Sequence, residues 1–417
     1  MKIGYLMQSG VRDIWKDTPS GPANHVRQVI KGLQRQGHQV RLLFRADGKT
    51  WKSDDLVKYD PVIVTWVDQG PVRWFERLIR RIQSEFQLPY FTFFDSLRFA
   101  LACCQELRGY DLLYERITWV GYGGGMASRW LQIPLVLEEN GNQLAMMDMM
   151  GNAPHGIQRK LESWLMQRAV SLAAHVVASG DGWREHFIER FGVKAEMVTT
   201  VENGTALVHL LNREVLRSFR NIEEDNHALT LVYLGGFYPW HGVNILIRAF
   251  SRACKQGLNL RLLLIGSGIG VNEAESLADN LGMNNKIHFA GNLLPEEFAP
   301  LLADANIGLS PYCGWVEYSG LKLLDYKAAG LAIIASGLDG KPATIKDGEM
   351  GYVVPPCDED ALYDAIVKLA SNKKLIQRMG RISRLSAEET NTWEHTVNDL
   401  ERVFIHVLSK DHAKLQG

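Results

Sequence analysis

Short apolar runs alternate with amphipathic helical patterns along most of the chain, and this alternation predicts parallel strands connected by helices. In the first half, the predicted strands are KIGYLM, QVRLLF, PVIVTWV, DLLYER, PLVLEE and HVVAS. In the second half, they are LTLVYLG, NLRLLLIG, KIHFAG, ANIGLSP, LAIIAS and GYVV. Near the end, WEHTVNDLERVFIHVLSK has the period of one long amphipathic helix. We therefore expect an α/β protein with two doubly wound parallel sheets.

Between the two series of strands, residues 212–229 are polar and lose the alternation, which is typical of a linker. The predicted boundaries are 1–211 for an N-terminal domain, 230–392 for a C-terminal domain and 393–417 for the terminal helix. Ligands of parallel sheets bind beyond the carboxyl ends of the strands, so we expect the site in a cleft between the two domains.

The composition is that of a globular protein, with 46% hydrophobic and 22% charged residues. A formal net charge of −1 gives no global basic field for nucleic acid. No apolar run reaches the roughly 18 residues that a membrane span needs, and MKIGYLMQSG is interrupted too early for a signal peptide. The five cysteines show no metal-ligand or CxxC spacing, so we expect buried free thiols and a reducing cytoplasm. They are Cys103, Cys104, Cys254, Cys313 and Cys357.

The segment VEYSGLKLLDYKAAGLAIIAS predicts a helix and then a buried strand, with Ser319 as the N-cap and Gly330 at the helix end. A helix N-terminus offers free N–H groups, and Lys322 adds a full positive charge in the first turn. Glu317 precedes the helix, and Asp325 lies about two turns into it. This pattern suits a diphosphate and sugar hydroxyls. Ordinary surface charges are the alternative.

Two glycine-containing turns follow predicted strands of the second half. In YLGGFYPWHGVN, Gly235 and Gly236 allow close backbone approach to a ligand, and His241 could meet a phosphate or a ring. A plain turn with a packed tryptophan is the alternative. In LLIGSGIG, Gly266 begins an incomplete dinucleotide fingerprint, because Val271 occupies the last glycine position. A tight turn is the favoured interpretation there.

The first half contains two weaker candidates for an acceptor site. SGPANHV places Gly21 and Pro22 at the start of a helix and His25 in its first turn. LVLEENGNQ places Glu139 and Asn140, with the preceding glutamate, just past a buried strand. Paired carboxylates can do acid–base work, but they can also cap a loop.

The segment VRWFERLIRRIQSEF, residues 72–86, combines four arginines with aromatic and aliphatic side chains. It could lie on an anionic membrane at about 1 kcal/mol per basic residue. An ordinary amphipathic surface helix is the favoured alternative.

Taken in order, these motifs resemble the retaining glycosyltransferases of the GT-B fold, in the family 4 (group 1) type. The segments that carry the resemblance are GPANHVRQVIKGLQRQGHQV, VVAS, VENG, YLGGFYPWHGV, LLLIGSG, IHFAGNL, ANIGLSPY and EYSGLKLLDYKAAGLAIIAS. The resemblance implies two Rossmann-like domains that face each other, with the terminal helix returning to the N-terminal one. It implies a nucleoside-diphosphate sugar on the C-terminal domain, a glycan, lipid-linked or small-molecule acceptor on the N-terminal domain, and no cofactor or metal.

The resemblance also implies site roles. Glu317 maps to the acidic residue that contacts the donor sugar, and Asp325 to the one that contacts the ribose. The helix start meets the diphosphate, and the loop after IHFAG reads the base. Besides Ser319 and Lys322, the positions concerned are Gly320 and Leu321 at the helix start and Gly291, Asn292 and Leu293 in the loop.

The sequence departs from the family at the phosphate site. Gly236 and His241 occupy positions where the family has Arg and Lys. Either His241 is charged when the diphosphate binds, or Lys322 and the helix dipole carry more of the interaction. Asn140 stands where the family has His. The departure at Gly236 and His241 makes a catalytically degenerate binding protein one alternative function. A sugar-nucleotide epimerase on the same GT-B scaffold is another. A nicotinamide oxidoreductase lacks its glycine fingerprint after the first strand.

Overall fold

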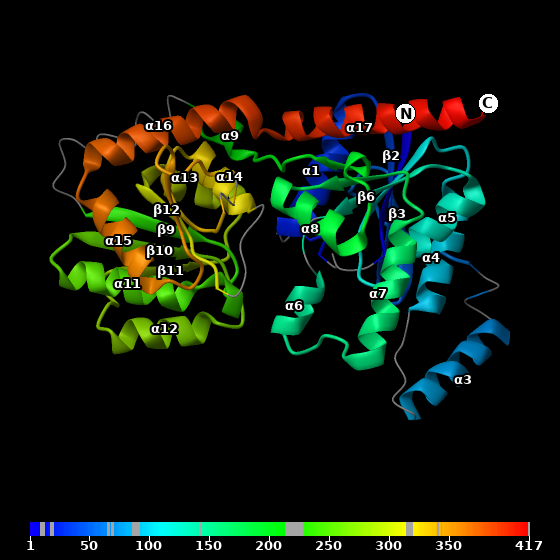
Figure 1. Ribbon diagram of the computed structural model, residues 1–417, viewed down its shortest axis with the longest axis horizontal. Coiled ribbons are helices and arrows are strands. Elements are labelled where there is room, and N and C mark those ends of the chain that lie inside the picture. The colour runs from blue at the N-terminus through cyan, green and yellow to red at the C-terminus, as the bar shows by residue number, and fades with distance from the viewer. Residues whose placement is uncertain are drawn as a thin grey trace. The chain divides into compact units, whose positions relative to one another are not determined.

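The computed structural model describes most of the chain in two compact units (Figure 1). Unit 1 comprises Met1–Ser179, Trp183–Val201 and Val397–Gly417, and unit 2 comprises Gly180–Gly182 and Glu202–Thr396. The structure describes all residues except 9–12, 17–20, 65–66, 68–70, 86–91, 140, 142, 213–227, 314–319, 340–341, 343 and 416–417. The predicted site residues Glu317, Ser319 and Asn140 therefore lie outside the described residues.

In unit 1, the described strands form one sheet in the order β4-β3-β2-β1-β5-β6-β7-β8. Their bounds are β1 (Lys2–Met7), β2 (Gln39–Ala46), β3 (Lys49–Ser53), β4 (Asp60–Val62), β5 (Leu112–Arg116), β6 (Leu135–Glu139), β7 (His175–Ala178) and β8 (Val198–Thr200). The central strands are parallel and buried, as their continuous apolar runs predict.

One edge of this sheet is antiparallel, which corrects the expectation of a purely parallel sheet. A two-residue turn, Asp47-Gly48, joins β2 to β3, and both residues have positive φ, 51° and 73°. An Asp-Gly pair between strands favours this hairpin geometry. The apolar run PVIVTWV contributes only its first residues to a strand, in β4.

The helices of unit 1 lie between its strands along the chain. Their bounds are α1 (Gly21–Arg35), α3 (Pro71–Glu85), α4 (Phe93–Glu106), α5 (Gly123–Leu131), α6 (Gln143–Met149), α7 (Gly156–Val170) and α8 (Asp181–Phe191). The terminal helix α17 (Trp393–Leu415) joins unit 1 from Val397 onward. Its Phe404 ring lies 5.1 Å from that of Tyr114, and Glu401 accepts from His38 at 2.9 Å. The terminal helix therefore returns to the N-terminal domain, as expected.

In unit 2, the described strands form a fully parallel sheet in the order β11-β10-β9-β12-β13-β14. They are β9 (Leu229–Leu234), β10 (Leu260–Ile265), β11 (Ile287–Gly291), β12 (Ile307–Ser310), β13 (Ala332–Ser336) and β14 (Gly351–Val354). β9 lies between β10, which pairs with it on one side, and β12, which pairs with it on the other. The carboxyl ends of β9 and β12 thus form a topological switch point, where such sheets bind ligands.

Two core clusters cover the faces of this sheet, since alternate residues of β9 belong to different clusters. Leu231 and Tyr233 pack with the helices of one face, and Val232 packs with those of the other. The first face carries α11 (Val243–Lys255), α12 (Val271–Asn280) and α15 (Glu359–Ala370). The second carries α9 (Leu207–Leu210), α13 (Pro295–Asp304) and α14 (Leu321–Ala328), and α16 (Lys373–Thr390) contributes to both clusters.

The domain boundary lies earlier than the sequence predicts. Leu207 and Leu211 are 2% exposed and pack in the core of unit 2, so residues 202–211 belong to unit 2 and not to the N-terminal domain. Most of the predicted linker, 213–227, lies outside the described residues, and its last residue, Leu229, begins β9.

Candidate active site

Three glycines bring the ends of β9, β10 and β11 into close backbone contact. Gly235 donates its N–H to Ile265 at 2.9 Å, and Gly266 donates to Gly291 at 2.7 Å. A Cβ at Gly266, where φ is +136°, would lie 1.8 Å from the Gly235 carbonyl oxygen. Gly266 therefore makes the favoured tight turn, because no larger residue fits there.

Helix α14 begins beside these turns. Gly320 occupies the N-cap position of α14. The prediction of Ser319 as the N-cap was therefore wrong by one residue. The helix ends where Gly330, with φ of +63°, donates to Lys327 at 2.8 Å, as predicted. The first turn contains no acidic residue to satisfy the helix dipole.

Lys322 is the central cation of this region. It is only 8% exposed, and its Nζ donates to the Tyr312 hydroxyl at 3.2 Å. The ammonium lies 4.6 Å from the Tyr312 ring centroid and 5.4 Å from that of Tyr233. A Cβ at Gly235 would lie 3.2 Å from Lys322 Cε, so the lysine stem runs along the glycine turn. A shielded cation beside a helix N-terminus is an arrangement that favours an anion.

His241 is anchored to the glycine turn. Its Nδ1 donates to the Gly236 carbonyl oxygen, because a carbonyl oxygen can only accept. Burial and the nearby Lys322 charge lower the pKa of His241 to about 3. In the unliganded protein, Lys322 is therefore the charged side chain beside this turn, and the charge of His241 with a diphosphate bound stays a prediction.

The Tyr238 ring fills the space beside Gly236. A Cβ at Gly236 would lie 2.6 Å from the Tyr238 ring. Tyr238 in turn stacks on Trp240, with centroids 5.0 Å apart and an interplanar angle of 4°. An arginine at position 236 could not fit unless this stack moved, so the departure from the family is built into the local packing.

Asp325 interacts with a residue that sequence reasoning did not single out. Thr205 Oγ1 donates to its Oδ1 at 2.6 Å and accepts from the Leu207 N–H at 3.0 Å. Burial raises the pKa of Asp325 to about 7. In the sequence, the feature that points to Thr205 is its position directly after Asn-Gly in VENGT, near the start of unit 2.

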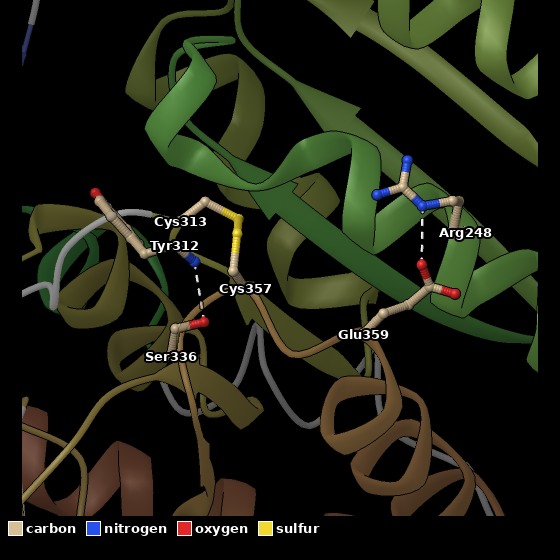
Figure 2. Close-up of a disulfide and its surroundings, with 6 residues drawn as sticks. All are labelled: Arg248, Tyr312, Cys313, Ser336, Cys357 and Glu359. Atoms are coloured by element: carbon tan, nitrogen blue, oxygen red, sulfur yellow. Dashed lines mark hydrogen bonds and ion pairs between the residues drawn. A yellow bond between two sulfur atoms is a disulfide. The ribbon is translucent and has the colours of Figure 1, made fainter. Parts of the chain in front are cut away.

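The loops after β12 and β14 are joined by a disulfide between Cys313 and Cys357 (Figure 2). The expectation that all five cysteines are free thiols was therefore wrong. The cysteines consequently no longer support the prediction of a reducing compartment. The cysteines are 44 residues apart, but parallel strands place both loops at one sheet edge. Tyr312 is fixed on both sides, since its N–H donates to Ser336 at 2.9 Å and its carbonyl accepts from Cys357 at 2.8 Å.

Removing this disulfide should destabilise unit 2. For a cross-link of this span, loss of loop-closure entropy predicts that Cys357→Ser lowers the free energy of unfolding by about 2–4 kcal/mol. Chemical denaturation measures this change, and Cys254→Ser, at a free half-buried thiol, is the matched control. Equal stability of wild-type protein with and without reductant would refute the predicted contribution.

In unit 1, Glu138 lies near the end of β6, and both of its carboxylate oxygens have buried partners. His25 Nε2 is paired with its Oε1, and the Tyr5 hydroxyl donates to its Oε2 at 2.7 Å. Burial alone would raise the pKa of Glu138, but His25, Arg116 and Tyr5 together lower it to about 2. His25 is therefore a buried, paired histidine, which was the alternative to a role at the site.

Glu139 is the remaining unit 1 candidate that can titrate near neutral pH. It is 7% exposed, and its Oε1 accepts from the Gly141 N–H at 3.1 Å. Burial raises its pKa to about 7. Gly21 and Pro22 are exposed at the first turn of α1, the same helix that carries His25 to Glu138.

The base-reading candidates lie at the sheet edge of unit 2. Gly291 ends β11 with φ of +71°, and Asn292 and Leu293 follow it before α13. Gly320 and Leu321 lie at the start of α14.

Among the described residues, none of the helices combines the length and hydropathy of a membrane span, and no cluster of His, Cys, Asp and Glu is grouped to hold a metal.

Two family models match the chain. The model described as "Glycosyl transferase 4-like domain" matches residues 20–204, and "Glycosyl transferases group 1" matches residues 228–372. Together they span both units, and the chain belongs to the GT-B glycosyltransferases of the family 4 type.

Individual relatives are distant but cover most of the chain. A D-inositol 3-phosphate glycosyltransferase of Saccharomonospora viridis is 24% identical over 416 residues, 96% of this chain and 91% of the relative. The sucrose-phosphate synthase of Thermosynechococcus elongatus has a TM-score of 0.72 at 19% identity, covering 98% of this chain and 100% of its own. Anabaena HepE in complex with UDP-glucose has a TM-score of 0.67 at 17% identity, covering 97% and 100%. These structural likenesses show a shared fold.

Proposed function

We propose that the protein is a retaining, metal-independent glycosyltransferase that uses a UDP- or GDP-hexose. Its acceptor is a hydroxyl group of a glycan, a lipid-linked sugar or a small molecule, in glycan, glycolipid or cell-envelope polysaccharide synthesis. The observation that carries the proposal is the position of Lys322 at the N-terminus of α14, beside the Gly235 turn. The relatives, among them an inositol-phosphate glycosyltransferase and a protein bound to UDP-glucose, support the class of substrate.

In this proposal, the donor diphosphate lies against Gly235, Gly236 and the first turn of α14. The N–H groups of Leu321 and Lys322 point out of the helix start, and the Lys322 ammonium supplies the full charge. The base lies towards Gly291, Asn292 and Leu293, at the end of β11. From the family resemblance, Glu317 meets the donor sugar and Ser319 meets the diphosphate.

The proposed chemistry is a front-face displacement at the anomeric carbon. The acceptor oxygen forms its bond to this carbon as the bond to the diphosphate oxygen breaks on the same face. The acceptor proton passes to the leaving phosphate oxygen, so no covalent enzyme intermediate is needed. Negative charge grows on the leaving diphosphate, and the cation and helix end would stabilise it without reorganisation.

Unit 1 carries the acceptor in this proposal, through Gly21, Pro22, Glu139 and Asn140. The proposed location is the cytoplasm, where residues 72–86 contact the inner face of a membrane and make the enzyme peripheral. This location fits the amphipathic character of that segment.

The test is a transfer assay of the full chain with UDP- and GDP-hexoses, hydroxyl acceptors and EDTA. The expected product keeps the anomeric configuration of the donor, as read by NMR, and forms equally well with EDTA. An inverted product or dependence on added metal would contradict the proposal. A changed sugar nucleotide formed without acceptor would indicate an epimerase, and nucleotide binding without turnover would indicate a degenerate protein.

A further inference from the structure

Helix α3 is paired with α4 of unit 1 through Glu76 and Arg80, and Val72 and Ile79 of the same helix are partly buried. Glu76 is 6% exposed and paired with the buried Arg98 of α4. Arg80 donates to the other Glu76 oxygen at 2.8 Å and to Asp95 of α4 at 3.3 Å. Ion pairs to α4 therefore help to hold the helix in an orientation that leaves its larger apolar side chains outside, whereas a surface helix of a globular protein normally buries them.

The apolar side of α3 faces solvent as a result. Trp74 is 62% exposed, Leu78 is 40% exposed and Ile82 is 43% exposed, and these residues follow each other at four-residue intervals. Phe75 lies next to them on the helix and is 52% exposed. We name these four side chains the α3 apolar face. The segment is an amphipathic surface helix, as the favoured prediction has it, and its larger apolar side chains are exposed.

Exposed arginines border this face. Arg73, Arg77 and Arg81 each precede one of the aligned apolar residues by one position, which places a basic row along one side of the face. Figure 1 shows α3 at the periphery of unit 1, near α4. Aromatic and aliphatic side chains next to a row of arginines are the pattern that inserts into the interface of an anionic bilayer.

We infer that the α3 apolar face docks unit 1 on an anionic lipid surface. The apolar side chains enter the headgroup boundary, and the arginine row pairs with lipid phosphates. The Glu76–Arg98 pair keeps the face turned outward, so docking needs no rearrangement of unit 1. This inference deepens the membrane part of the proposed function, but docking itself does not depend on the transfer reaction.

The experiment is co-sedimentation of the full chain with two kinds of vesicle, phosphatidylcholine alone and an equal mixture with phosphatidylglycerol. We expect binding to the mixed vesicles that weakens with salt, and little binding to phosphatidylcholine. The double variant Arg77→Gln/Arg81→Gln should reduce partitioning onto mixed vesicles by about thirtyfold, at about fivefold per basic residue. Trp74→Ser/Leu78→Ser should reduce it by at least tenfold.

The matched control is Trp130→Ser on α5, because Trp130 is 49% exposed on the same unit but lies outside α3. It should bind mixed vesicles as the wild type does. Equal binding to both vesicle types, or unchanged binding by either α3 variant, would overturn the inference. So would a dimer in size-exclusion chromatography that Trp74→Ser/Leu78→Ser converts to monomer without any vesicle binding, because a second copy would then cover the face. Failure of transfer activity leaves these outcomes unaffected.

Discussion

Replacing Lys322 by Met should lower kcat for sugar transfer by about a hundredfold to a thousandfold. Methionine keeps the volume of a side chain that is only 8% exposed, but it removes the charge that stabilises the leaving diphosphate. Loss of one preorganised electrostatic contact of this kind typically costs about 3–4 kcal/mol of transition-state stabilisation. Initial-rate kinetics with the preferred donor measure the change.

The control is Lys255→Met, which removes an exposed lysine at the end of α11 in the same unit. It should leave kcat within about twofold, because surface substitutions rarely exceed ±0.5 kcal/mol. Lys322→Arg keeps the charge and should retain more activity than Lys322→Met. Equal rates for wild type and Lys322→Met would exclude Lys322 from the chemistry.

The second large effect is expected in the core of unit 1. Glu138→Ala should lower the free energy of unfolding by about 3–5 kcal/mol, because it leaves His25 and Arg116 without their buried carboxylate. Chemical denaturation measures it. Glu401→Ala is the control, since it breaks a histidine–glutamate pair whose glutamate side chain is 32% exposed, compared with 3% for Glu138. That pair should contribute about 1 kcal/mol or less.

The same carboxyl group predicts a pH dependence of stability. The pKa of Glu138 is lowered from 4.5 to about 2 in the folded protein, so its contribution is fully present above pH 4.5. It is lost as the pH falls from there towards 2. The free energy of unfolding should therefore fall more steeply across this range in wild type than in Glu138→Gln. Parallel pH profiles would show that Glu138 does not hold its charge in the fold.

Much of the fold follows from the hydrophobic pattern. Continuous apolar runs such as IGYLM and LTLVYL can only be buried on both faces, and this predicts the parallel strands β1 and β9. The antiparallel edge departs from the predicted parallel sheet, although Asp47-Gly48 in RADGKT is a strong local signal for a hairpin turn. The early domain boundary was missed because Leu207 and Leu211 can pack in either unit, and only the fold determines which.

The candidate site was predictable in part. Lys322 stood out because lysine is unfavourable in the first turn of a helix unless an anion is near. Its aromatic surroundings, Tyr312 and Tyr233, come from two other strand ends, so periodicity within α14 does not reveal them. The Thr205–Asp325 hydrogen bond and the Cys313–Cys357 disulfide join residues far apart in sequence, and neither leaves a local pattern. The outward face of α3 likewise depends on Glu76 meeting Arg98.

The most direct test of the donor site is thermal unfolding of wild type and Lys322→Met with UDP, GDP, ADP and NAD. A ligand at 100 times its Kd adds about 2.7 kcal/mol, which raises the Tm by several degrees. We expect UDP or GDP to raise the Tm of the wild type, and Lys322→Met to lose most of that shift. A shift with NAD alone, or an equal nucleotide shift in both proteins, would contradict a diphosphate site at Lys322.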